Sequence, residues 1–264
     1  MHRSTLIPAV LAVLVLAACS KEDKPAAPTT GAGNAAAAGA DVWPAVGPLL
    51  AGSHTGSCTR TPQLDAVEAT ISLDAEGKLT APDISADMRK PQMIQLSRET
   101  AGGAVKVGAM VSMDAEKGPV LTLSDEGKPD GAGAALMRGE QMISCPKGPP
   151  LDKLRSQPLY KSMARFVDSP GIAVTCVSRA NPLEQKKAEF KLTGGMATLG
   201  AESFDLSRAE TETLMIIPAE NQVLYSFKLP GGPLMQVGYD LSGKLVALQD
   251  GGASGLTRGC QVES

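Results

Sequence analysis

Four of the five cysteines, those that follow Cys19 of the N-terminal signal, constrain the fold of this chain more than any other feature of its sequence. Cys58 and Cys145 are 87 residues apart, and Cys176 and Cys260 are 84 residues apart. In an oxidising compartment an even number of cysteines indicates disulfide bonds, and four allow three pairings. The two nearly equal spans favour Cys58–Cys145 with Cys176–Cys260. By closing a loop of this length, each bond would stabilise the folded state by about 4.5 kcal/mol in the chain-entropy model, and by less in practice.

The equal spans also suggest that one unit occurs twice, and short sequence matches support this. The matches are Cys58 with Cys176, 71–73 with 190–192, 127–128 with 243–244, and the pattern D-G-x4-L-x-R-G that starts at Asp130 and again at Asp250. Their offsets run from 116 to 120 residues, a small drift that fits an old tandem duplication. One mismatch remains, because Cys260 directly follows its Arg-Gly whereas Cys145 lies six residues after Gly139. The alternative is chance similarity in a chain rich in glycine and alanine.

Alternation of apolar and polar residues predicts strands in both units. The alternating or strand-like segments are 67–73, 105–113, 120–123, 190–192, 214–217 and 223–229. A period of two residues is the mark of a half-buried strand, and turn residues separate these segments. The sequence therefore predicts a mainly β fold with two tandem related domains, each an antiparallel β-sandwich or small barrel.

A short helix is expected before each β domain. Apolar residues in 151–167 have helical spacing with a break near Pro158, and 42–50 is a shorter counterpart interrupted by Pro48. The predicted β domains are then 42–147 and 151–262. Trp43, the one tryptophan, is expected to anchor the packing, with a partner-facing position as the alternative.

The first nineteen residues contain a targeting signal. Arg3 gives a basic start, and 6–16 is apolar except for Pro8, which is too short for a membrane span but suits a signal peptide. The end, Leu16-Ala17-Ala18-Cys19, resembles the lipobox of bacterial lipoproteins. The resemblance implies removal of 1–18 and attachment of lipid to Cys19, so that several acyl chains give a stable membrane anchor. The alternative is a plain secretory signal with a chance cysteine.

Residues 20–40 contain no aromatic and no large aliphatic side chain. They cannot build a core, so the lipidated cysteine and a flexible linker are expected to occupy 19–41. By resemblance to the sorting rule of Gram-negative lipoproteins, Ser20 after the cysteine implies delivery to the outer membrane. The predicted location is the cell envelope, lipid-anchored in the outer membrane and facing the periplasm.

Composition excludes several functions. The net charge is −3 and aromatic residues make up 3%, so neither a basic surface for duplex DNA nor a stacking surface for single strands is expected. Beyond the signal only His54 remains as a histidine, and we interpret it as an exposed loop residue rather than part of a catalytic triad. The separated cysteines and single histidine form no zinc cluster, and no metal or other cofactor is predicted.

The most suggestive polar pair is Arg138-Gly139 and Arg258-Gly259, at the ends of the repeated pattern. A shared arginine could bind a carboxylate, and the structural alternative is that it closes the last hairpin of each unit. Trp43, Arg138 and Arg258 are therefore the candidate binding residues, and no catalytic residue is predicted.

These observations predict a non-catalytic protein-binding module in the envelope, such as an inhibitor or immunity protein against a cell-wall hydrolase. The predicted partners are the membrane, through the lipid anchor, and an envelope protein. The alternatives are a structural or assembly lipoprotein and a carboxylate-dependent hydrolase. The inhibitor hypothesis follows the general plan of anchor, tether and rigid β units, which is an analogy rather than a site.

Overall fold

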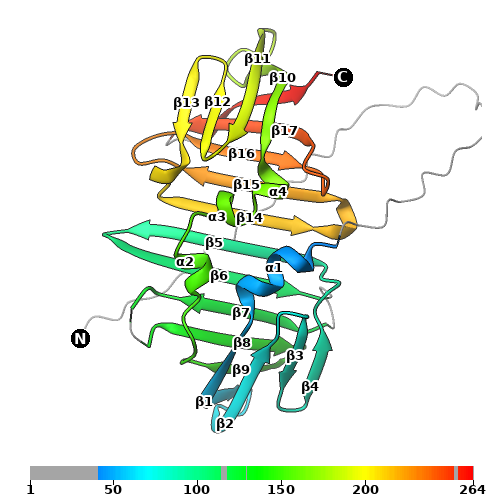
Figure 1. Cartoon of the computed structure of the whole chain (residues 1–264), viewed down its shortest axis with the longest axis vertical. Coiled ribbons are helices and arrows are strands. Elements are labelled where there is room, and N and C mark those ends of the chain that lie inside the picture. The colour runs from blue at the N-terminus through cyan, green and yellow to red at the C-terminus, as the bar shows by residue number, and fades with distance from the viewer. Residues whose placement is uncertain (1–40, 114–117, 129, 253–254, 264) are drawn as a thin grey trace, which may run out of the picture. The chain divides into compact units, whose positions relative to one another are not determined.

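The computed structural model describes residues 41–113, 118–128, 130–252 and 255–263. The expected signal 1–18, the lipidation site Cys19 and the linker to residue 40 lie outside the described residues. Eighteen strands dominate the described part, and short helices accompany them (Figure 1). Strands β1 to β9 make up what we call the first half, and β10 to β18 make up the second half.

The first-half strands are β1 (Gly52–Thr61), β2 (Asp65–Leu73), β3 (Lys78–Ala81), β4 (Ile84–Asp87), β5 (Met93–Ala101), β6 (Ala104–Ser112), β7 (Val120–Asp125), β8 (Ala132–Arg138) and β9 (Gln141–Cys145). The second-half strands are β10 (Ser169–Ser178), β11 (Gln185–Thr193), β12 (Met196–Leu199), β13 (Glu202–Asp205), β14 (Thr211–Ile217), β15 (Gln222–Lys228), β16 (Leu234–Tyr239), β17 (Leu245–Gly252) and β18 (Gly255–Val262).

All the described strands belong to one antiparallel sheet. The order in the first half is β4-β3-β2-β1-β9-β8-β7-β6-β5. The order in the second half is β13-β12-β11-β10-β18-β17-β16-β15-β14. Strand β5 pairs with β14, which joins the halves. Among the described strands β4 and β13 each have one neighbour, so the sheet is not closed into a barrel.

The predicted mainly β fold is confirmed, but the strands do not form a sandwich or barrel in each half. Both halves share one sheet, and their described residues belong to one compact unit. The physical reason is that hairpin signals are local, whereas β5 and β14 lie more than a hundred residues apart. Apolar alternation shows which face of a strand is buried but not which distant strand lies beside it.

The junction between the halves is centred on Leu96 and Leu214, which face each other on β5 and β14. These leucines are 118 positions apart, the same offset as Cys58 and Cys176. On both sides of the junction the strands follow one another in the same order. Two residues, one in each half, therefore correspond when they occupy the same position in equivalent pairs of strands.

Register shows that one of the sequence matches is misaligned. Asp130 precedes β8, whereas Asp250 lies inside β17. Arg138 ends β8 opposite Gln141, whereas Arg258 lies within β18 opposite Asp250. The two arginines therefore do not close equivalent hairpins. Turn-forming sequences rich in glycine resemble one another wherever they occur, which explains the match.

The structure contains the disulfides Cys58–Cys145 and Cys176–Cys260, the pairs that the spacing predicts. The first joins β1 to β9 and the second joins β10 to β18, and each links neighbouring strands of the sheet. Each bond thus ties the first strand of a half to its last strand.

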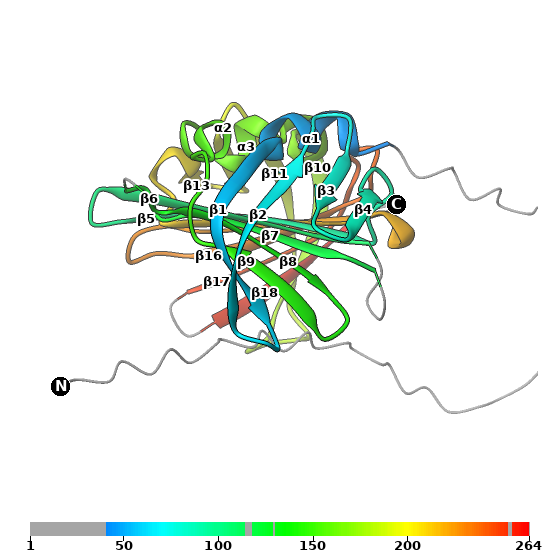
Figure 2. The ribbon, with the colours of Figure 1, turned by 90° about the horizontal axis from the view of Figure 1, so that it is seen from below.

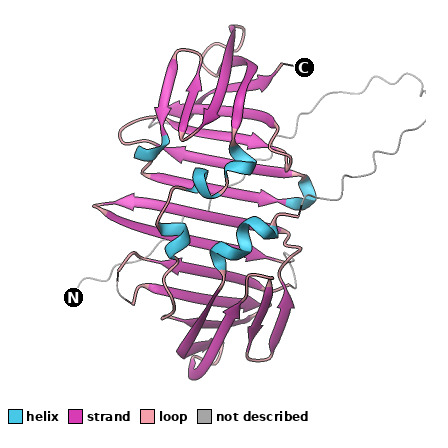
Figure 3. Cartoon of the chain, viewed as in Figure 1, coloured by secondary structure: helices cyan, strands magenta, loops and turns pink. Residues whose placement is uncertain are grey.

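Four α-helices cover one face of the central strands (Figures 1, 2 and 3). They are α1 (Trp43–Leu50), α2 (Asp152–Arg155), α3 (Leu159–Ser162) and α4 (Ala164–Val167), and 3-10 turns span 206–208 and 218–220. Both expected helical segments are present, and the second is divided, with Pro158 capping α3. Proline fixes the backbone and lacks an N–H group, so it begins a helix more readily than it continues one.

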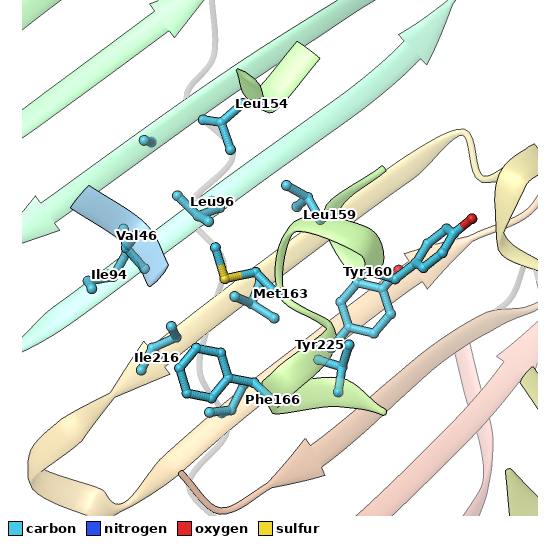
Figure 4. Close-up of a cluster of buried hydrophobic side chains, with 14 of the residues drawn as sticks. Val46, Ile94, Leu96, Leu154, Leu159, Tyr160, Met163, Phe166, Ile216 and Tyr225 are labelled. Atoms are coloured by element: carbon cyan, nitrogen blue, oxygen red, sulfur yellow. The ribbon is translucent and has the colours of Figure 1, made fainter. Parts of the chain in front are cut away.

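The core lies between the helices and the sheet (Figure 4). Leu96 and Ile216 from the central strands pack beneath Leu159 of α3, Phe166 of α4 and Met163 between these helices, and all five are almost fully buried. One continuous hydrophobic cluster extends through both halves. No helix among the described residues has the length and apolar character needed to cross a membrane.

Candidate binding surface

The face of the sheet away from the helices differs in chemistry from the core face. Side chains alternate along each strand, so buried Val223 and Tyr225 point to the helices while Leu224 between them points outward. The same alternation applies to β16, where buried Met235 and Val237 flank outward Gln236. The outward positions of the second half form the candidate surface.

Two rows of outward residues cross β14 to β18 and β10 without a charged side chain, and on β11 the second row reaches Lys187, which faces Thr175. The first row is Thr213, Ser226, Gln236, Gln249, Gly259, Val177 and Gln185, and the second is Met215, Leu224, Gly238, Ala247, Gln261 and Thr175. Residues next to each other in a row face each other on neighbouring strands. Amides and hydroxyls in these rows can donate and accept hydrogen bonds.

Two hollows lie over these rows. One of about 510 Å³ covers β15, β16 and β17, and a second of about 780 Å³ covers β17, β18, β10 and β11. Both include Ala247, Leu248 and Gln249, so they adjoin along β17. We call the combined depression the trough, and define it by the outward residues Leu224, Gln236, Gly238, Ala247, Gln249, Gly259, Gln261, Thr175, Val177 and Gln185.

Apolar side chains stand at the rim of the trough. Val246, which lines the first hollow, is 57% exposed. Leu183 is 95% exposed and follows Pro182, which lines the second hollow. Leu64 is also 74% exposed, but it lies in the β1–β2 turn of the first half and lines neither hollow. Isolated exposed apolar residues are ordinary, but here two of them border one depression, together with the charged residues Glu220, Asp240 and Arg179.

The buried carboxylates have protein partners on the helix side of the sheet. Asp125 accepts hydrogen bonds from the Gly127 and Leu151 N–H groups at 2.8 and 2.9 Å. Asp250 is paired with Arg258, and this hydrogen bond raises the pKa of the arginine. These carboxylates hold turns and strands in place.

Glu212 is the most enclosed carboxylate of this group. Its Oε1 accepts hydrogen bonds from the Tyr225 hydroxyl at 2.7 Å and from the Tyr160 N–H at 3.3 Å. Burial raises the pKa of Glu212, although the hydrogen bonds and the nearby Arg98 oppose this shift. Its side chain has no exposed surface, which places it out of reach of a substrate in this structure.

Trp43 occupies the packing position rather than a partner-facing one. Its side chain is 3% exposed, and its indole N–H donates a hydrogen bond to the Ala75 carbonyl at 2.9 Å. Gly47 and Gly77 approach the indole so closely that a Cβ at either position would overlap it. The tryptophan therefore holds α1 against the β2–β3 turn.

The two candidate arginines are separated and differ in environment. Arg258 makes ion pairs with Asp250 and, at 3.0 Å, with Glu202 on the edge strand β13. Arg138 is exposed and lines a hollow of about 220 Å³ in the first half. The structure therefore does not bring Arg138 and Arg258 together, and neither lines the trough.

His54 is not the exposed loop residue that the sequence suggests. It lies in β1, is 2% exposed, and faces Ile71 on β2. The corresponding residue of the second half is Ile172, which faces Phe190. The match of 71–73 with 190–192 points to this position, because the strand partners of those segments also correspond. The trough glutamines gave no such signal, since outward polar residues occur on most strands.

No group of three or more metal-ligating side chains gathers in the described part of the chain. Comparison with known proteins finds no matching family model, no similar curated protein and no similar solved structure.

Proposed function

We propose that the protein is a lipid-anchored envelope protein whose folded part binds another protein through the trough. The lipobox at residues 16–19 supports the anchor, and Ser20 supports outer-membrane delivery with the folded part facing the periplasm. The binding is non-catalytic. A cell-wall hydrolase is the class of partner to test first, because an inhibitor of such an enzyme would need this location and a rigid docking surface.

The observation that carries this proposal is the hollowed sheet face, where the two rows of outward residues are uncharged from β14 to β18 and on β10, and where apolar and charged side chains stand at the border. Charged residues are depleted at the centre of protein interfaces, because burying them costs free energy unless each finds a partner. The glutamine amides of the trough can hydrogen-bond a partner's backbone without introducing a charge. Leu183 and Val246 offer apolar area at the border, which suits a protein better than a charged small molecule.

We also infer that the two halves arose by tandem duplication and correspond to the predicted domains 42–147 and 151–262. Identical strand order, the offset of 118 at the junction and the matching disulfides support this origin. The trough then belongs to one copy, in which outward residues have diverged. Gln236 and Gln249 face each other on β16 and β17, as Thr122 and Ala135 do on β7 and β8.

This correspondence supplies a matched experiment on the protein as it is processed and lipidated in the cell. A photoreactive amino acid would replace Gln249 in the trough or Ala135 at the corresponding place, and crosslinking would be done in intact cells. We expect one adduct of defined mass from position 249 and none from 135. Mass spectrometry would identify the partner, which would then be purified.

Binding of the purified partner would be measured for the wild type and for Gln249→Lys and Ala135→Lys. A lysine buried at the interface without a counter-ion should weaken binding at least about tenfold, equal to 1.4 kcal/mol, whereas the change at 135 should have little effect. Equal effects at both positions would refute the trough as the binding surface. Adducts to peptidoglycan alone would favour a wall-associated structural role instead.

A further inference from the structure

His54 is buried without a hydrogen-bond partner for either ring nitrogen in the described structure. Such groups are rare in folded proteins, because an unpaired polar atom loses its hydrogen bonds to water. Its counterpart in the second half is the apolar Ile172, so the fold does not need a polar residue at this place. The imidazole is therefore a feature of the first half alone.

The cover over His54 is thin. Residues 146–150, which we call the strap, lead from β9 towards α2. Gly148 lies against the imidazole so closely that a Cβ on it would overlap Nδ1. Pro149 on the strap is exposed to solvent, so little more than the strap itself separates the ring from water. A small movement of the strap would hydrate the ring.

The strap is connected to the helix layer at its far end. The Leu151 N–H donates a hydrogen bond to the Asp125 Oδ2 at 2.9 Å, and Arg155 lies 3.5 Å from Asp125. Lys153 donates to the Pro48 carbonyl of α1 at 2.8 Å. The strap thus belongs to the segment that connects the two halves and docks α2 on the first half.

Charged groups around the strap do not neutralise a proton on His54. Lys147 on the strap is exposed, and Asp125 is already bound to Leu151 and Arg155. Across the sheet the facing residue is the apolar Ile71. Burial lowers the pKa of His54 below 6.5, and no neighbouring charge contributes to this shift.

We propose that His54 and the strap form an acid-sensitive latch: the strap covers the neutral imidazole and lifts when the ring takes up a proton. In the open state water reaches the ring, so the imidazole regains its ordinary affinity for protons. As pH falls below 6.5, the open state therefore binds the proton first, and the ratio of open to closed molecules rises. The rise is up to about tenfold per pH unit until the pKa of the covered ring is reached. This inference does not depend on the proposed function.

The test uses NMR of the full-length protein between pH 7.5 and 5.5. The sequence has two histidines, His2 and His54. The NMR resonance that disappears in His54→Ile therefore belongs to His54. We expect the His54 imidazole to titrate below 6.5. The Leu151 amide should lose protection from hydrogen exchange, corrected for intrinsic rates, as the pH falls. In His54→Ile, which copies the residue of the second half, this loss should be absent.

A second variant opens the latch without changing the histidine. In Gly148→Ala the methyl group should hold the strap away from the ring, so that the pKa of His54 returns towards 6.5 and the Leu151 amide exchanges faster at every pH. The latch is refuted if His54 in the wild type titrates at its ordinary value. It is also refuted if wild type and His54→Ile lose Leu151 protection equally on acidification.

Discussion

The junction of the halves contains one asymmetric pair of residues. Arg98 faces Glu212 across β5 and β14, whereas Ile94 faces Ile216 at the corresponding place beyond the central leucines. The Arg98 Nη1 lies 3.5 Å from the Glu212 Oε2, and the arginine side chain is 14% exposed. One side of the junction is therefore joined by apolar packing and the other by a buried ion pair.

Removing one partner of a buried ion pair leaves an unpaired charge. Arg98→Ile should lower the free energy of unfolding by about 3–5 kcal/mol at pH 8. Burial already raises the pKa of Glu212, so the folded state takes up a proton more readily than the unfolded state. The stability contributed by this group is therefore greatest at low pH and is lost as pH rises. The cost of Arg98→Ile should accordingly be smaller at pH 5 than at pH 8, measured by urea unfolding.

The double variant Arg98→Ile with Glu212→Gln provides the control for this prediction. Glutamine is uncharged, and its side-chain oxygen can still accept a hydrogen bond from the Tyr225 hydroxyl. Most of the lost stability should return, and the pH dependence should disappear. A loss that is the same at both pH values, or no recovery in the double variant, would contradict this account of the pair.

Single residues differed in how far the sequence revealed their environment. Trp43 could be interpreted as a packing residue because it begins an apolar segment with helical spacing. His54 could not, because Gly52, Ser53 and the residues after it resemble a loop, and a polar side chain gives no sign of burial. Glu212 was equally hidden, since its partners Arg98 and Tyr225 come from other strands.

At the scale of elements, the two disulfides fasten equivalent pairs of strands. Replacing Cys58 and Cys145 together by serine should lower the free energy of unfolding by about 2–5 kcal/mol, because the unfolded chain regains the freedom of a long loop. The corresponding serine variant of Cys176 and Cys260 is the matched comparison, since its loop is of nearly the same length. Denaturant unfolding under non-reducing conditions measures both. A negligible loss in either variant would show that the sheet alone holds those strands together.

Hairpins and helices could be predicted because their signals lie close together in the sequence. The strand pairs that join distant segments could not, and β5–β14 is the clearest example. Corresponding residues are 118 apart at the junction but 115 apart at Cys145 and Cys260, because the connecting turns differ in length. A constant offset of 120 therefore aligned Arg138 with Arg258, which lie in different strands of their halves. The trough could not be predicted either, since it is formed by the first strands of the second half, β10 and β11, together with its last strands, β15 to β18.

The whole molecule has one sheet and one continuous core, and this affects how it unfolds. Core residues of both halves contact each other beneath the helices, and the central strands share hydrogen bonds. Unfolding one half would expose the apolar face and the strand edge of the other. The halves are therefore expected to unfold together rather than as independent domains.

Trp43 makes this cooperativity measurable. The chain has one tryptophan, and it lies in α1 beside the first half. Serine at Cys176 and Cys260 weakens the second half alone, yet it should shift the unfolding transition reported by Trp43 fluorescence. Circular dichroism, which follows strands of both halves, should show the same midpoint. An unchanged Trp43 transition beside a shifted circular dichroism transition would indicate two independent domains.

The outermost strands, β4 and β13, have four residues each and finish with Asp87 and Asp205. An open sheet can be lengthened by any copy that adds a strand to its end, and repeated addition produces a fibril. Such short end strands give an added strand few hydrogen bonds, so its addition gains little free energy. Molecules crowded on one surface are thus expected to remain separate, and the sheet of each molecule should not extend into that of its neighbour.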